Sequence, residues 1–280
     1  MPATLVERYV HGHHASVLAA HATRTAANSC GYFLDRLRPG DTILDLGCGP
    51  GTITCDLAER VGETGRVVGV DFASDAVDTA RQTARERGRG NVTFAVGDLY
   101  QLDLEPASFD VVHAHQVLQH VPDPVAALRE MAAYVKPGGL IAVRDADYGA
   151  MTWHPASPGL DTWRAVYSAG ARASGAEPDA GRRLRSWVLA AGLEVVAATG
   201  SVWTYATPET TGWWAGSQAD RIRHSAFIRH AQAQGLSAAE IEQIAASWQE
   251  WGEKPDAWFF LPHGEIVATT AHTDRPGAAS

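Results

Sequence analysis

The feature that most constrains the fold is an alternation of short β-type runs with helical runs between residues 42 and 144. Runs such as "VVGV" and "LIAV" are apolar along their whole length, which is typical of parallel strands that helices cover on both faces. Right-handed crossovers then bring the carboxyl ends of the strands to one edge of the sheet, where ligands bind in such folds. The sequence therefore predicts a doubly wound α/β fold.

The predicted sheet is mostly parallel and seven-stranded. Its strands cover residues 42–46, 66–70, 92–96, 109–113, 140–144, 193–201 and 265–271. The predicted helices that connect the early strands cover residues 52–61, 74–87 and 124–134, and the apolar residues of 16–37 also recur at helical spacing. About fifty residues of helical pattern separate the last two strands, although a connection of about 2 to 6 residues is usual.

Three regions follow from this pattern. We expect an N-terminal helical cap at residues 1–37, a ligand-binding core at 38–147 and the remainder of the sheet at 148–280. The last region includes a helical insertion at about 204–257, which is predicted to face the substrate as a lid or to form a contact between subunits. A homodimer is therefore a possible assembly.

Composition and charge argue against several classes of partner. The formal net charge is -9 and no cluster of five or more basic residues occurs, so we expect no binding to nucleic acid. The apolar runs are shorter than the roughly 20 residues that span a bilayer, so we expect no membrane contact. The three cysteines, Cys30, Cys48 and Cys55, lack metal-ligand spacing, and the sequence starts without a leader pattern. These features indicate a cytoplasmic protein.

The stretch "ILDLGCGPGT", residues 43–52, ends the first strand on three alternating glycines. Gly47, Gly49 and Gly51 bring bare backbone amides and the positive end of the next helix close to a ligand. Dinucleotide sites usually follow the pattern G-x-G-x-x-G, whereas the spacing here is G-x-G-x-G with Asp45 before it. The Asp45 carboxylate would repel phosphates and favour a cationic group.

Two further acids follow the next two strands. Asp71 ends "VVGVD", where a carboxylate can accept both hydroxyls of a ribose, and Asp98 in "VGDL" can accept from the exocyclic amine of an adenine. S-adenosylmethionine has an amino group, a ribose diol and an adenine, and it has no phosphate. A nicotinamide-dependent reductase is the alternative for this fold, but no Tyr-x-x-x-Lys pair supports it.

Residues 38–144 resemble the class I S-adenosylmethionine-dependent methyltransferases, in the branch of the ubiquinone and menaquinone C-methyltransferases. The matching stretches are "ILDLGCGPG", "VVGVDFASDAV", "VTFAVGDLYQL" and "FDVVHAHQVLQHVPDPVAALREMAAYVKPGGLIAV". The resemblance makes residues 38–147 the S-adenosylmethionine-binding core. It also implies cofactor contacts from Asp45, Gly47 and Gly49 to the methionine part, from Asp71 to the ribose, and from Phe72, Asp98 and Leu99 to the adenine. The long helical segment before the last strand departs from this branch and leaves the substrate class open.

The run "HAHQVLQHV" supplies the candidate catalytic residues. Methyl transfer is an in-line displacement that needs an aligned acceptor, exclusion of water and, for some acceptors, a proton acceptor. We expect His115 and Gln116 to face the donor methyl, with His115 as the base and as a cofactor contact. His120 is a further candidate, although it could simply cap a turn, and His113 could simply pack in the core.

Two other polar runs are candidates. In "YVHGHH", Tyr9 or a neighbouring histidine is predicted to lie near the cofactor carboxylate, and a metal site there matches no familiar spacing. In "RDADYGAM", Asp145 and Asp147 are expected to face the acceptor, with Asp147 among the catalytic residues. A magnesium site built on this pair is an alternative, but we expect no metal.

All nine tryptophans lie between Trp153 and Trp258, in the half without the glycine bend. Tryptophan is more often a core residue than a ligand contact, but this confinement favours an aromatic cage around a flat acceptor. The predicted substrate-binding residues are Tyr148, Trp153, Trp203, Trp213 and Trp214, and Trp163 and Tyr205 lie in the same region.

The predicted function is methyl transfer from S-adenosylmethionine to a small aromatic metabolite. C-methylation, for instance of an indole in natural-product biosynthesis, is favoured because an electron-rich carbon needs alignment more than a strong base. O- or N-methylation of a small metabolite is the first alternative. A non-catalytic module that only binds S-adenosylmethionine is the second.

Overall fold

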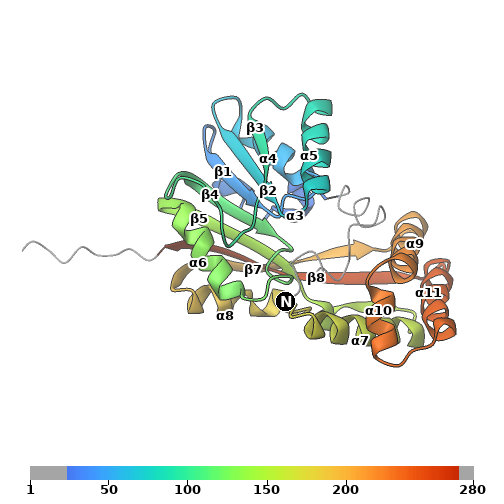
Figure 1. Cartoon of the computed structure of the whole chain (residues 1–280). Coiled ribbons are helices and arrows are strands. Elements are labelled where there is room, and N and C mark those ends of the chain that lie inside the picture. The colour runs from blue at the N-terminus through green and yellow to red at the C-terminus, as the bar shows by residue number, and fades with distance from the viewer. Residues whose placement is uncertain (1–23, 271–280) are drawn as a thin grey trace, which may run out of the picture.

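The computed structural model describes residues 24–270. A single sheet forms its centre (Figure 1). Its strands are β1 (Thr42–Leu46), β2 (Arg66–Asp71), β3 (Val92–Val96), β4 (Phe109–His115), β5 (Val135–Ala146), β6 (Thr152–His154), β7 (Leu193–Tyr205) and β8 (Trp258–Thr270). The helices are α3 (Ala26–Ser29), α4 (Thr52–Val61), α5 (Ser74–Glu86), α6 (Pro124–Tyr134), α7 (Pro158–Ala173), α8 (Ala180–Ala190), α9 (Pro208–His224), α10 (Phe227–Ala233) and α11 (Ala238–Gly252), with 3₁₀ turns η1 (Leu34–Arg36) and η2 (Tyr148–Ala150).

The sheet topology confirms the predicted doubly wound α/β class. The strand order is β3-β2-β1-β4-β5-β8, with parallel pairs from β3 to β5 and with β8 antiparallel to its neighbours. The sheet has eight strands rather than the predicted seven. The additional strand, β6, pairs with the first residues of β8, while β7 pairs with β8 along nearly its whole length.

Helices cover both faces of the sheet, as the apolar strands require. On one face, Ile43 of β1 and Val111 of β4 pack with the apolar side chains of α3 and α4. On the other face, Leu44 and Val112, each the next residue along its strand, belong to a cluster with Leu128 of α6 and residues of α8. Alternate residues of one strand thus enter two different cores.

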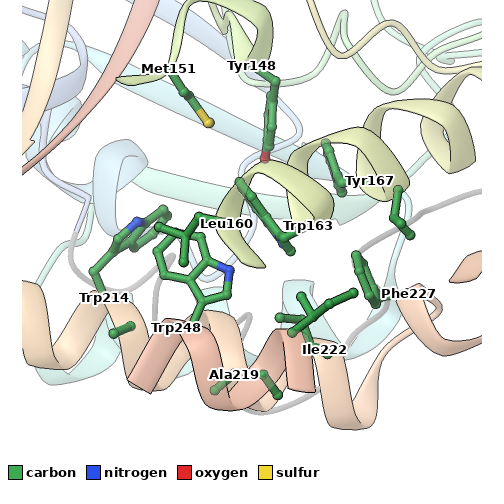
Figure 2. Close-up of a cluster of buried hydrophobic side chains, with 14 of the residues drawn as sticks. Tyr148, Met151, Leu160, Trp163, Tyr167, Trp214, Ala219, Ile222, Phe227 and Trp248 are labelled. Atoms are coloured by element: carbon green, nitrogen blue, oxygen red, sulfur yellow. The ribbon is translucent and has the colours of Figure 1, made fainter. Parts of the chain in front are cut away.

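A third core lies beyond the parallel strands, where α7 packs against α10 and α11, and α9 packs against the same two helices. Figure 2 shows Leu160 and Trp163 of α7 facing Trp214 of α9 and Trp248 of α11. Trp248 is fully buried, and its ring meets that of Trp163 edge to face with 4.9 Å between the centroids. Three helices, α9 to α11, therefore occupy the predicted insertion between β7 and β8. Within residues 24–270, no helix is both long enough and apolar enough to cross a membrane.

Candidate active site

A cavity of about 840 Å³ lies at the carboxyl edge of the sheet and extends to α9 (Pro208–His224). Its lining comes from the ends of β1, β2 and β4, from β7 and from that helix. The predicted site residues that line it are Asp45, Gly47, Gly49, Asp71, Phe72, Asp98, Leu99, His115, Gln116, His120, Tyr148, Trp203, Trp213 and Trp214. Residues predicted as cofactor contacts and residues predicted as acceptor contacts therefore share one cavity.

The glycine bend lies between β1 and α4 and has little room for side chains. Gly47 and Gly51 have φ angles of 67° and 77°, in the left-handed region that favours glycine. A Cβ on Gly47 would lie 2.4 Å from the Val117 side chain, and one on Gly51 would lie 2.8 Å from the Ala80 side chain. The amide of Gly47 donates to the Val70 carbonyl across 2.8 Å, which fastens the bend to β2. The backbone is thus shaped for close approach of a ligand.

Asp71 lies at the end of β2, as predicted. One of its carboxylate oxygens accepts from the Gly49 amide and the other from the Ala73 amide, both at 2.9 Å. Each oxygen keeps a second lone pair, so the carboxylate is held in place and can still accept from two ligand hydroxyls. Phe72 beside it lines the cavity and is 39% exposed, which leaves its ring free to cover a flat group. Asp98, after β3, accepts from the Tyr100 amide with one oxygen.

Asp45 is already engaged within the protein. His113 donates a hydrogen bond from Nδ1 to one carboxylate oxygen across 2.7 Å, and the Thr54 hydroxyl donates to the other across 2.6 Å. Burial disfavours the charged form of His113, but the nearby Cys30 and the hydrogen bond to Asp45 together raise its pKa to about 10. The resulting imidazolium compensates the Asp45 charge, so His113 packs in the core as an ion-pair partner.

His115 is a buried histidine at the wall of the cavity. It lines the cavity but is only 5% exposed, and neither ring nitrogen has a hydrogen-bond partner. Burial, followed by the positive charges of Arg24 and Arg144, lowers its pKa well below the usual value. The ring is therefore neutral at physiological pH and can accept a proton only from a strong acid.

Gln116 connects three distant parts of the chain. Because an arginine only donates, Gln116 must turn its side-chain oxygen toward Arg24, at 2.7 Å, and its amide nitrogen toward His263 Nε2, at 2.8 Å. Gln116 has a positive φ of 55°, and its amide donates to the Arg144 carbonyl. The side chain thereby fixes His263 as a proton-free acceptor at Nε2.

His120 lies beside Gln119 at the same wall. The Gln119 side-chain oxygen accepts from the Ala146 amide, so its nitrogen donates to His120 Nε2 across 2.9 Å. Burial, followed by the positive charge of Arg24, lowers the pKa of His120 to about 3. His120 is thus a second neutral imidazole at the cavity, and a weaker base than an exposed histidine.

Trp203 lines the cavity and has contacts on several sides. Its indole nitrogen donates to the Asn28 carbonyl across 2.9 Å, and the Arg144 guanidinium lies 4.9 Å from its ring centroid. Arg144 is fully buried and donates to Glu265 and Ser201. The ion pair under Trp203 fixes the position of that ring against His115, whose centroid is 5.7 Å away.

Aromatic residues of β7 and α9 form the far end. Tyr205 stacks on Trp214 with 4.6 Å between centroids and an angle of 6° between planes, and Trp213 lies next to both. Tyr148 lines this end and stacks on Tyr167 behind it. Three of the nine tryptophans, Trp203, Trp213 and Trp214, line the cavity. A flat ligand can lie among these rings.

Two predicted site residues lie outside the cavity. Asp147 accepts from Arg182 with both oxygens, at 2.6 Å each, so it is a buried ion-pair partner rather than an acceptor contact. Trp153 stacks on Phe259, with Arg164 4.7 Å from its ring centroid, and belongs to the third core. These placements correct the expectation that both residues face the acceptor. Tyr9 lies outside the described residues.

The cavity also contains residues that sequence reasoning missed. Arg24 and Arg221 line it. His263 accepts a hydrogen bond from the lining residue Gln116. The sequence could have indicated Arg221, because it is a lone arginine on the apolar face of a helix that also contains Trp214 and Ile222. Within residues 24–270, no group of three or more potential ligands could hold a metal ion.

Comparisons with known proteins agree with this geometry. A family model described as a methyltransferase domain matches residues 37–176. An uncharacterized methyltransferase of Schizosaccharomyces pombe is 33% identical over 269 residues, covering 92% of this chain and 95% of that protein. A demethylmenaquinone methyltransferase of Lactococcus lactis is 37% identical, over 42% of this chain and 45% of that protein. The structure of geranyl diphosphate C-methyltransferase from Streptomyces coelicolor A3(2), with S-adenosyl-L-homocysteine bound, has a TM-score of 0.51 at 17% identity, covering 90% of this chain and 78% of that one.

Proposed function

The chain belongs to the class I S-adenosylmethionine-dependent methyltransferases, and we propose that it methylates a carbon atom of a small aromatic metabolite, for instance an indole. S-adenosylmethionine supplies an electrophilic methyl group when it is bound. The observation that carries the proposal is His115, a neutral and weakly basic imidazole with two unpartnered ring nitrogens at the cavity.

The cofactor end of the cavity fits S-adenosylmethionine. Gly47 and Gly49 line this end without side chains, so the methionine part can approach the backbone, and the Asp71 carboxylate keeps lone pairs for the two ribose hydroxyls. Phe72 and Asp98 also line the cavity, which supports an adenine that stacks on the ring and donates its amine to the carboxylate. Asp45 supports this end indirectly, because its charge is shared with His113.

Weak basicity at His115 favours carbon over oxygen or nitrogen as the acceptor atom. A phenol has a pKa near that of tyrosine, about 10, and a base with a strongly depressed pKa removes its proton poorly. An electron-rich ring needs no base before transfer: its π electrons form the new C–C bond while the S–CH₃ bond breaks. The methylated ring is then a cation and a strong acid, so even a weak imidazole can take the proton from its ring carbon.

The end of the cavity formed by Tyr205, Trp213 and Trp214, here called the acceptor end, suits a flat acceptor. Trp203 lies against His115, and Tyr205, two residues further along β7, stacks on Trp214, so a ring lying against Trp203 would have one edge near His115. The surrounding rings also exclude water, which would otherwise compete for the methyl group.

The test is methyl gain measured by mass spectrometry, with labelled S-adenosylmethionine and a panel of indoles, phenols, quinols and small amines. NMR of each product locates the added methyl group. Methylation of a ring carbon supports the proposal. Transfer only to phenolic oxygen or to amines contradicts it and requires a stronger base than His115. Cofactor binding without turnover on any acceptor would favour a non-catalytic binding module.

A further inference from the structure

Two buried donors on α9 point to a ligand that the chain itself does not supply. Arg221 is only 9% exposed and lines the acceptor end of the cavity. Its Nε is buried without a hydrogen-bond partner, and within residues 24–270 no carboxylate forms an ion pair with it. Trp214, two helical turns earlier, is 5% exposed, and its indole N–H is also buried without a partner. Both donors therefore lie at one face of α9 without an acceptor.

An unpaired buried cation is costly, because the loss of its hydration is not offset by an opposite charge. In the part of the chain that the structure describes, no charged side chain offsets it. Tyr148 and Tyr205 are neutral phenols whose pKa values burial raises, and the Trp214 ring, whose centroid is 5.9 Å from the guanidinium, gives only a cation–π contact. Arg24 adds a second positive charge, which acts on the same two tyrosines. The acceptor end is therefore electropositive.

The charges of the cavity are divided between its two ends. Asp71 and Asp98 lie at the cofactor end, whereas Arg221 and Arg24 lie at the acceptor end. Glu209 is the acid that lines the acceptor end within the described residues, and it is exposed and forms no ion pair there. A guanidinium is planar and carries several donors, which match the two oxygens of a carboxylate.

We propose that Arg221, with the Trp214 indole N–H, binds a carboxylate on the acceptor, so that the substrate class is a flat aromatic acid. This proposal rests on the proposed function in one respect, namely that this end of the cavity holds the acceptor. The carboxylate would anchor the molecule at α9 while its ring lies among Tyr205, Trp214 and Trp203, toward His115. Arg221 is thus a specificity-determining residue.

The experiment compares matched probes that differ only in charge. Indole-3-acetate and indole-3-acetamide, and likewise benzoate and benzamide, are titrated by calorimetry into protein loaded with S-adenosylhomocysteine. We expect the acid of each pair to bind at least about tenfold more tightly than its amide, and Arg221→Gln to remove that difference. Arg223→Gln is the matched control, because Arg223 lies on the same helix but faces Glu242 outside the cavity. It should preserve the difference.

Equal binding of acid and amide to the wild-type protein, or a preserved difference in Arg221→Gln, would overturn the proposal. A second measurement, the melting temperature of the unliganded protein, accompanies the titration. Arg221→Met replaces an unpaired buried charge with an apolar chain of similar length, so the melting temperature of the unliganded protein should be unchanged or higher. A fall of about 5 °C or more would show that Arg221 has a structural partner instead. Binding needs no turnover, so this inference can fail while methyl transfer stands, and the reverse also holds.

Discussion

The side-chain amide of Gln116 donates a hydrogen bond to Nε2 of His263 across 2.8 Å, which joins the end of β4 to β8 over 147 residues of sequence. Because Arg24 occupies the amide oxygen, the nitrogen has no other orientation, and His263 must present a proton-free nitrogen to it. Burial is the first cause that lowers the pKa of His263 well below its usual value. One amide therefore holds an imidazole neutral at the wall of the site.

Gln116→Glu should reverse this effect. A carboxylate at that position would pair with Arg24 and would accept, rather than donate, at its other oxygen, so His263 would gain a proton and its pKa would rise. Histidine ring signals followed by NMR should then show His263 titrating between about pH 5 and pH 8, where the wild-type ring stays neutral. Gln119→Glu is the matched control, because it makes the same change beside His120. A wild-type His263 that titrates near its usual pKa would contradict the assignment.

Asp71→Ala should weaken S-adenosylhomocysteine binding by about 10- to 100-fold, since it removes a charged acceptor of the two ribose hydroxyls. The same change frees the Gly49 and Ala73 amides, so the bend also loses its support. Calorimetry with the wild type and with Asp75→Ala, an exposed acid in the first turn of α5, provides the comparison. Unchanged affinity in Asp71→Ala would show that the ribose does not bind at the end of β2.

His115→Gln should lower the turnover number by about 10²- to 10⁴-fold while affinity for S-adenosylhomocysteine is kept, because the change removes the proton acceptor and not a cofactor anchor. In the wild type, the neutral ring predicts that turnover stays level from pH 8 down to about pH 6. His154→Gln, at an exposed histidine on β6, is the control. Equal turnover in His115→Gln and wild type would exclude His115 as the base.

Asp145 predicts a pH dependence of stability. Burial raises its pKa to about 8, so the folded protein keeps a proton that the unfolded chain loses near an ordinary aspartate pKa of about 4. The folded state therefore binds more protons across this interval, and its stability falls as the pH rises from about 4 to about 8. Asp145→Asn should flatten the decrease in melting temperature between about pH 4 and pH 8. Asp103→Asn, at an exposed acid, should leave the decrease unchanged, and a decrease as steep in Asp145→Asn as in wild type would contradict the account.

Trp248→Ala should cost about 3 to 5 kcal/mol of unfolding free energy, because the indole is fully buried between α7 and the inner side of α11. Trp258→Ala, where the side chain is 38% exposed, should cost far less. Urea unfolding of the two variants measures the difference. Equal losses would mean that the third core does not stabilise the fold through this residue.

The local sequence pattern was enough to predict the parallel sheet and the positions of the acids that follow its strands. Alternation fixed where β2 ends, so Asp71 could be placed at the ligand edge before any contact was known. The same reasoning failed at Asp147, because its position after β5 does not reveal Arg182 of α8, which donates to both of its carboxylate oxygens. A residue's partner is set by packing between elements, and sequence spacing does not contain it.

The tryptophans show the same limit. Their confinement to one half was visible, but it could not separate Trp214, at the cavity, from Trp248, which is buried in a core. Helical periodicity places both on apolar faces, and both pack in the third core (Figure 2), but it does not show that Trp214 also lines the cavity. Arg24 and His263 were missed because Gln116 brings them together from opposite ends of the chain.

The pairing of Tyr205 with Phe259 puts the last residue of β7 beside the second residue of β8, so the chain leaves the sheet and returns to it at neighbouring points. Helices α9 to α11, which carry Trp213, Trp214 and Arg221, therefore form an insertion whose two ends lie next to each other on the sheet (Figure 1). Such a segment can be exchanged or lengthened in evolution without altering the register of the strands beneath it. The same junction offers protein engineers a place to graft a new acceptor pocket onto an unchanged methyl-donor site.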